Sequence, residues 1–188
     1  MDKKRLIQNL GLVLNLGAKA RGNYLKKHNI FSEVGENVRF QPRIIPLYPE
    51  LIKLHNNIMI GAGVRFITHD ASYAVLNNLN TGIKFPEKVG CIEIMDNVFV
   101  GYNATILPNV RIGENCIIGA NTTVTKDLDP NGVYAGTPAK KIGTFDEFMK
   151  RLLPNDETNE FDYSTVSINQ KINKQEIERA WKLFDEAR

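Results

Sequence analysis

IMDNVF-VGYNAT-ILPNVR-IGENCI-IGANTT-VTKDLD is the stretch from Ile94 to Asp129, divided into units of six residues. The first position of every unit is aliphatic: Ile94, Val100, Ile106, Ile112, Ile118 and Val124. A period of six fits neither the turn of an α-helix, about 3.6 residues, nor the simple alternation of a long strand. It indicates a short strand and a tight turn, repeated so that one side chain per unit points to a common axis. The sequence therefore predicts a β-solenoid.

The other positions of the unit predict how each coil turns. Positions one, three and five should lie on one face of a short extended segment, and positions two, four and six on the other. The fifth residue is small or apolar and should pack beside the first. Asparagine holds the fourth position in five of the six units, and glycine holds the second in three. Because both residues tolerate left-handed backbone conformations, we expect the chain to turn there.

The same phase appears in two earlier blocks and is then interrupted. The blocks are VGENVR-FQPRII, residues 34–45, and LHNNIM-IGAGVR, residues 54–65, with an irregular, proline-containing corner between them. Over residues 71–92 the period disappears, and the segment is polar. A loop of about twenty residues that leaves a regular solenoid is more often functional than structural. We therefore expect an excursion loop over 71–92, with the segment Phe66-Ile67-Thr68-His69-Asp70 at its root.

Composition and charge argue against several classes of function. The 188 residues suit one domain with short helical additions. A net charge of +3 is too small to argue for nucleic-acid binding. The apolar run from Leu10 to Leu16 is too short for a membrane span, and we expect no signal peptide. The protein is therefore expected to be cytoplasmic, with Cys91 and Cys116 unpaired.

Both ends of the chain are expected to be helical. Residues 1–30 form a predicted helical cap, in which the apolar residues have helix-like spacing and nearly all charged residues are basic. Such a basic amphipathic segment would either cover the open first coil of the solenoid or touch an anionic membrane or polymer. Residues 144–188 form a predicted helical extension, with helices over 144–153 and 173–188 and a polar linker over 154–169.

Two segments together resemble a known family. They are the FITHD segment at the root of the loop and the stretch IGANTTVTKDLDPNGVYAGTPAKKI, from Ile118 to Ile142. With the hexads, they make the chain similar to the hexapeptide-repeat acyltransferases, and within them to the sugar and capsular polysaccharide O-acetyltransferases, such as the maltose and galactoside enzymes. The resemblance covers about residues 34–143. It implies a mainly β fold, with a left-handed parallel β-helix as the acyltransferase domain over 31–143.

The activity implied by the resemblance is acetyl-CoA-dependent O-acetylation of a hydroxyl of a sugar or polysaccharide precursor. His69 matches the family's general base, which takes the hydroxyl proton in a direct transfer within a ternary complex. Such a base is worth about 100- to 10,000-fold in rate. The alternative for His69 is a histidine satisfied at a strand end. Asp70 would orient the imidazole, bind the acceptor or simply hold a turn.

Two further residues are implied on the acceptor side, and others on the side of coenzyme A. Phe99 matches an aromatic position near the acceptor, whereas Gln41 stands where the sugar enzymes carry an asparagine, so the acceptor is expected to differ. The backbone N–H of Tyr102, after Gly101, matches the donor to the thioester carbonyl, although the family usually has a small residue there. Ala120 matches a contact to the pantetheine arm.

The coenzyme-contacting row continues toward the end of the repeat. Thr125 follows Ala120 in that row, and Lys126 and Lys140 match basic residues that meet the nucleotide phosphates. The alternative for both lysines is a solvated position at the coil edge. The resemblance further implies a homotrimer with active sites between subunits, and no metal requirement.

Two alternatives to sugar acetylation stay open. Antibiotic acetyltransferases of the chloramphenicol and streptogramin type share the fold, and a resistance assay would separate them. Serine acetyltransferases carry a long helical N-terminal domain that thirty residues cannot supply. A non-catalytic β-helix scaffold is the alternative of a different class, and failure to bind coenzyme A would favour it.

Overall fold

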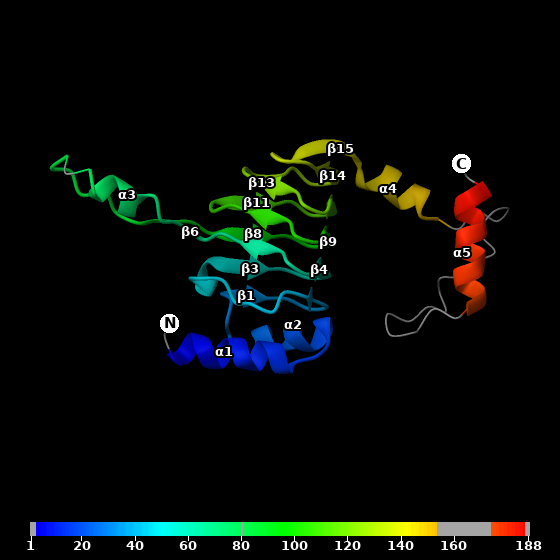
Figure 1. Ribbon diagram of the computed structural model, residues 1–188, viewed down its shortest axis with the longest axis horizontal. Helices are drawn as coiled ribbons and strands as arrows, with labels where there is room; N and C mark the ends of the chain where they lie inside the picture. The colour runs from blue at the N-terminus through cyan, green and yellow to red at the C-terminus, as the bar shows by residue number, and fades with distance from the viewer. Residues whose placement is uncertain (1–2, 80, 154–173, 187–188) are drawn as a thin grey trace. The chain divides into compact units, whose positions relative to one another are not determined.

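The hexads form a coil of short parallel strands in the computed structural model (Figure 1). The structure describes residues 3–79, 81–153 and 174–186. The chain divides into two compact units, residues 1–151 and 152–188, and the whole coil belongs to the first. In the second unit, the structure describes helix α5 (Lys174–Glu186). The predicted linker over 154–169 lies outside the described residues.

Three sheets are built by stacking equivalent strands of successive coils. The first contains β1 (Glu33–Val34), β3 (Ile52–Leu54), β8 (Ile92–Ile94) and β11 (Val110–Ile112). The second contains β5 (Arg65–Phe66), β10 (Thr105–Ile106) and β13 (Thr123–Val124). The third contains β2 (Arg39–Phe40), β4 (Ile58–Ile60), β9 (Val98–Val100), β12 (Cys116–Ile118), β14 (Gly132–Ala135) and β15 (Lys140–Thr144). All of these pairings are parallel except β14 with β15.

Strand register shows where the repeat gains residues. Val98 pairs with Cys116, so one coil takes 116 − 98 = 18 residues, or three hexads. Ile58 pairs with Val98, a step of 98 − 58 = 40, and the 22 extra residues lie between β5 and β8. Arg39 pairs with Met59, a step of 59 − 39 = 20, and the two extra residues lie between β2 and β3. The coil is therefore regular except at these two insertions and at its last turn.

The core confirms the predicted inward direction for the first and fifth positions of the hexad. All six first-position residues from Ile94 to Val124 are 0% exposed, and the fifth-position residues are also buried. The third position does not share their face, which corrects the prediction: Tyr102 and Ala120 are exposed. The reason is that a strand such as β9 occupies positions five, six and one only, so position three already lies in the turn. Alternation applies only within these short strands.

Asparagine makes the predicted turns and also a ladder. The fourth-position asparagines have φ between 54° and 61°, in the left-handed region. At one corner of the coil each side-chain amide donates to the asparagine of the next coil at 2.8–2.9 Å. The ladder consists of Asn37, Asn57, Asn97, Asn115 and Asn131. We call it the asparagine corner.

Glycine occurs at the second position of the hexad for a different reason from the one predicted. Gly101, Gly113 and Gly119 do not adopt positive φ. A Cβ on Gly101 would lie 2.6 Å from the backbone nitrogen of Ala120, in the coil above. Glycine is required there because stacked coils approach each other closely, and not because the turn is left-handed.

The excursion is an arm with an antiparallel root. Strands β6 (His69–Asp70) and β7 (Lys88–Val89) pair antiparallel, and helix α3 (Tyr73–Asn77) lies beyond them (Figure 1). The Asn77 side chain exchanges two hydrogen bonds with the backbone of Phe85, at 2.8 and 2.9 Å. Ile92 is buried in β8, so the arm ends before the predicted limit of residue 92.

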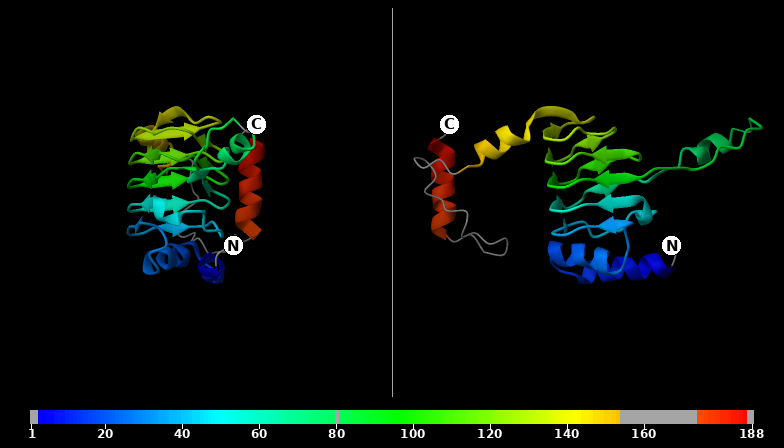
Figure 2. Two further views of the ribbon diagram at one scale, coloured as in Figure 1. Left: turned by 90° about the vertical axis from the view of Figure 1, so that its left-hand side faces the viewer. Right: turned by 180° about the vertical axis from the view of Figure 1, so that it is seen from behind.

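Two helices lie at one end of the coil, and a strand and a helix follow its other end. Helix α1 (Lys3–Leu14) packs on α2 (Ala18–Lys27), and α2 packs on β1 and β2 (Figure 2). The buried Arg21 fixes α2, since its Nε donates to the Phe40 carbonyl at 2.8 Å. A short 3-10 turn, η1 (Pro49–Leu51), precedes β3.

At the far end of the coil, the chain turns back on itself at the segment AGTPAK, residues 135–140. The chain reverses at Gly136, with φ of 95°, and β15 pairs back on β14 before α4 (Phe145–Arg151). In the part of the chain that the structure describes, no helix is long and apolar enough to cross a membrane.

Candidate functional site

His69 lies in β6, where the arm leaves the coil. Its backbone pairs with Val89, and its side chain is half-buried. The ring of Tyr48 meets the imidazole edge-on, with centroids 5.9 Å apart and planes at 87°. The His69 Nδ1 atom is buried and has no hydrogen-bond partner among the described residues. A buried polar atom left without a partner is a reason to expect a ligand or another chain at this place.

Tyr48 lies in the segment between β2 and β3 that contains the two extra residues, and sequence reasoning missed it. Its backbone is left-handed, with φ 50° and ψ 57°, which is a costly conformation for an aromatic residue. Its hydroxyl donates to Glu87 Oε2 at 2.9 Å, and this hydrogen bond raises the pKa of the Tyr48 phenol. The buried Thr68 donates to the Leu47 carbonyl, which ties the insertion to the root of the arm.

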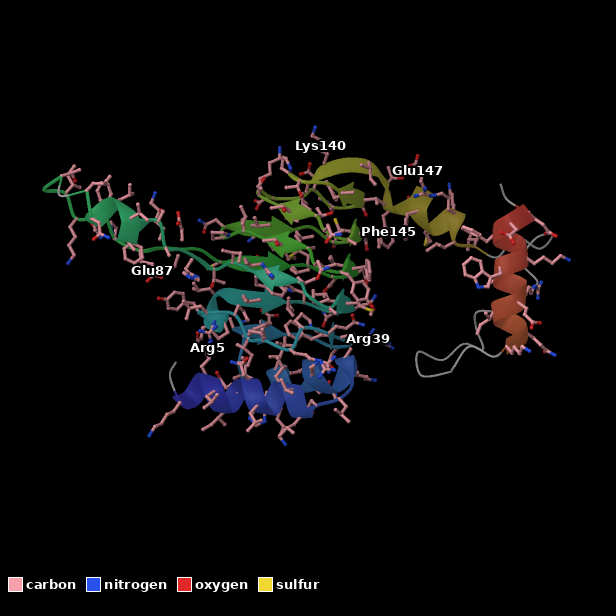
Figure 3. The ribbon with its side chains drawn as sticks, viewed as in Figure 1. Arg5, Arg39, Glu87, Lys140, Phe145 and Glu147 are labelled. Carbon is pink, nitrogen blue, oxygen red and sulfur yellow. The ribbon has the colours of Figure 1, made fainter. Side chains whose placement is uncertain are left out.

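Glu87 therefore connects the returning strand of the arm to the ring that contacts His69. Figure 3 shows Glu87 where the arm meets the coil. The only sequence signal for Tyr48 was the irregular, proline-containing corner around it, which named no chemistry. Glu87 carried no signal, since its partner lies 39 residues earlier in the chain.

Asp70 holds a turn, one of the roles that the sequence left open. Its Oδ1 accepts the backbone N–H of Ser72 at 2.8 Å, just before α3. The hydrogen bonds from Ser72 lower the pKa of the Asp70 carboxyl below its usual value. No hydrogen bond joins Asp70 to the His69 ring in the described residues.

A column of backbone N–H groups follows the second-position glycines of the third sheet. One coil apart, Ala62, Tyr102 and Ala120 come directly after Gly61, Gly101 and Gly119. The Ala62 N–H donates to Gln41 Oε1 at 2.9 Å, so Gln41 closes the column at its first coil. Among the described residues, nothing accepts a hydrogen bond from the N–H groups of Tyr102 and Ala120. These two donors are free to meet a carbonyl or amide of a ligand.

The remaining predicted residues lie on three different parts of the coil. Phe99 is half-buried on the outer face of β9, between Met59 and Ile117. Thr125 and Lys126 are exposed directly after β13. Lys140 is exposed in β15, at the far end of the stack (Figure 3).

One chain does not bring the predicted residues together. His69, Thr125 and Lys126 follow the strands of the second sheet, at what we call the arm corner. Gln41, Tyr102 and Ala120 follow the strands of the third sheet, at a separate corner. The second sheet lies between the two corners. A site that uses both corners would therefore draw on both sides of the second sheet.

A charge network on the first sheet was also missed. His55 Nε2 lies 3.0 Å from Glu93 Oε1, and Arg111 Nε donates to Glu93 Oε2 at 2.7 Å. The hydrogen bond with His55 and then that with Arg111 lower the pKa of the Glu93 carboxyl. This cluster lies on β8 and β11 and next to β3, away from the arm corner, and we interpret it as structural.

The chain is similar to several known proteins. The family described as bacterial transferase hexapeptide (six repeats) matches residues 92–126. A galactoside O-acetyltransferase of Lactococcus lactis is 32% identical over 178 residues, covering 81% of this chain and 75% of that protein. A solved galactoside acetyltransferase in complex with coenzyme A superposes with a TM-score of 0.55 at 26% identity, covering 82% of this chain and 86% of that one.

A Schizosaccharomyces pombe protein named as an acetyltransferase is 36% identical over 118 residues, but the aligned part spans only 54% of its length and 58% of this chain. The repeat, the arm and these matches define a hexapeptide-repeat transferase. The chain belongs to the hexapeptide-repeat acetyltransferase family, close to the galactoside O-acetyltransferases.

Proposed function

We propose that the protein transfers an acetyl group from acetyl-CoA to a hydroxyl of a sugar or polysaccharide precursor. The observation that carries the proposal is His69, half-buried at the root of the arm, with Tyr48 against its ring and a buried Nδ1 for which the described part of the chain supplies no hydrogen-bond partner. The similarity to galactoside O-acetyltransferases supports a sugar acceptor and acetyl-CoA as donor.

The chemistry assigned to His69 is that of a general base. The imidazole removes the proton of the acceptor hydroxyl while the hydroxyl oxygen forms its bond to the acetyl carbon and the carbon–sulfur bond breaks. The proton then passes from His69 to the departing sulfur, which leaves as the thiol of coenzyme A. No covalent bond to the protein is needed. Tyr48 holds the ring at a fixed angle, and Glu87 holds Tyr48.

The N–H column suits the donor side of the reaction. The Tyr102 N–H would donate to the thioester oxygen as negative charge develops there. The N–H of Ala120 would donate to an amide carbonyl of coenzyme A, and Gly101 leaves room at that nitrogen, because a Cβ on Gly101 would lie 2.6 Å from it. The half-exposed Tyr102 side chain stands where a small residue is usual, so it would border the acceptor. Further along, Thr125, Lys126 and Lys140 would bind the nucleotide end through its phosphates.

The assembly follows from the separation of the two corners. In our proposal the coils wind left-handed and three chains join, so that the arm corner of one chain faces the N–H column of its neighbour. Phe99 and Gln41 would then border the acceptor. The exposed Cys91 and the buried Cys116 are both free thiols, which supports a cytoplasmic location.

A substitution at His69 tests the function. His69→Ala should lower kcat/KM by about 100- to 10,000-fold, because the base is lost. The measurement is thiol release from acetyl-CoA over a panel of saccharides, nucleotide sugars and antibiotics. His28→Ala, at an exposed histidine whose ring packs against Tyr24 with centroids 4.5 Å apart, should leave the rate unchanged. The proposal fails if His69→Ala stays within a few-fold of wild type on the best acceptor, or if no acceptor on the panel releases thiol.

A further inference from the structure

Helix α1 presents its apolar side to solvent. At about 100° per residue, five aliphatic residues fall within an arc of roughly 120°. Four of them are more than half exposed, from 54% at Leu6 to 69% at Leu14. The arc consists of Leu6, Ile7, Leu10, Val13 and Leu14. A helix that packs on a protein normally has its apolar stripe turned the other way.

Contacts on the opposite side fix this orientation. Leu12 is fully buried, and it lies roughly 160° from the centre of the exposed arc. Asn9 Oδ1 accepts the Ile45 N–H at 2.8 Å, and Arg5 donates to the Ile45 carbonyl at 3.1 Å. Figure 3 shows Arg5 reaching from α1 toward the coil. Rotation of α1 to bury the arc would break both hydrogen bonds and expose Leu12.

The charged residues of the segment that contains α1 and α2 are basic. From Lys3 to Ser32 the sequence contains seven basic residues and no aspartate or glutamate. Arg21 is buried on backbone carbonyls, and Lys26 pairs with Glu36. Lys3, Lys19 and Lys27 are exposed. An apolar arc with basic neighbours matches a surface that is apolar below and anionic above, as a bilayer of acidic lipids is.

We infer that α1 binds the surface of an anionic lipid bilayer, with the arc of Leu6, Ile7, Leu10, Val13 and Leu14 inserted among the lipids. A second copy fits less well, because two such ends would bring only basic helices together. Helices α1 and α2 lie across the end of the coil stack, with β15 at the other end, so a flat surface can reach them (Figures 1 and 2). This binding is independent of the acetyl transfer proposed above.

Vesicle sedimentation of the full chain tests the inference. The protein should sediment with vesicles of equal parts phosphatidylcholine and phosphatidylglycerol, and not with phosphatidylcholine alone. The double variant Ile7→Glu/Leu14→Glu should lower the bound fraction by about tenfold or more, since both side chains lie in the arc. Lys19→Glu/Lys27→Glu should also weaken binding, and added salt should weaken the wild type.

The matched control is Ile142→Glu, a change of the same chemistry at a residue that is 67% exposed in β15. It should bind vesicles as the wild type does. Light scattering should give the same mass for every variant. The inference is overturned if the wild type ignores anionic vesicles, or if Ile7→Glu/Leu14→Glu binds them normally. It is also overturned if that variant loses mass, because the arc would then be an interface between copies.

Discussion

The asparagine corner and the arm corner are built from the same repeat and behave in opposite ways. At the asparagine corner five asparagines share the left-handed backbone conformation, and their side chains form hydrogen bonds from each coil to the next. Beside the arm corner Tyr48 takes that left-handed conformation, and the buried His69 Nδ1 finds no hydrogen-bond partner in the residues that the structure describes. Where the polar groups of a coil form hydrogen bonds with one another, we interpret the corner as structural. Where it leaves one unsatisfied, chemistry with another molecule is expected.

Among variants that keep both His69 and the N–H column, removal of the Tyr48 ring beside the arm corner should have the largest effect. Tyr48→Gly keeps the left-handed backbone and relieves its strain, but it frees the His69 imidazole. We expect kcat/KM to fall by about a hundredfold, as misplacement of a catalytic group does. The melting temperature should not fall. An active variant with a much lower melting temperature would show that Tyr48 is structural.

The asparagine corner should show the reverse pattern. Asn115→Ala places a Cβ-bearing residue without a capping amide at φ 54° and removes two rungs of the ladder. The midpoint of urea unfolding, at fixed protein concentration, should report a loss of about 1 to 3 kcal/mol. Asn115→Gly keeps the conformation and should lose less. If either variant lowered kcat/KM as Tyr48→Gly does, the two corners would not be distinct.

A smaller effect is expected from the link between Tyr48 and the arm. Tyr48→Phe keeps the ring on His69 but loses the hydrogen bond to Glu87, so kcat/KM should fall only a few-fold. Glu87→Gln retains an acceptor oxygen and serves as the conservative control. Steady-state kinetics with both variants would contradict this account if Glu87→Gln were the more damaging change.

The smallest effect belongs to the charge network on the first sheet. Hydrogen bonds with His55 and Arg111 lower the pKa of Glu93 in the folded chain. The ionised Glu93 carboxyl therefore stabilises the folded state fully at pH values above its ordinary, unfolded-state pKa. This stabilisation is lost as the pH falls through the lowered, folded-state pKa. Glu93→Gln should cost under about 1 kcal/mol at neutral pH and nothing in strong acid. Melting temperatures of Glu93→Gln and the wild type, measured from pH 7 downward, should approach each other as the pH falls. A difference in melting temperature that stayed constant over this range would refute the prediction.

The coil was predictable because the same pattern of burial and turning recurs in every hexad. Burial of Ile106 or Val100 is forced by position in the hexad, and the left-handed asparagines follow from their phase. Position three was misassigned because the hexad does not show which residues of each unit form the three-residue strand. His69 was found through the break in the period and through resemblance.

Contacts between residues far apart in the chain were not predictable. Tyr48 and Glu87 meet only because a two-residue insertion and the arm lie side by side, 39 residues apart in sequence. His55 and Glu93 pair through coil register, across the same inserted arm. Neither pair has a periodic pattern, so only the folded chain reveals them. The exposure of the apolar arc of α1 was also not predictable, since the spacing of apolar residues does not show which side of a helix packs against the protein.

The most direct test of the account is complementation between the two corners. His69→Ala disables the arm corner, and Ala120→Trp blocks the N–H column, so each variant alone should be inactive. If each site joins the arm corner of one chain to the column of its neighbour, an equal mixture co-assembled by co-expression should recover about a quarter of wild-type thiol release. No recovery in co-assembled trimers would contradict it, because both corners would then serve one chain.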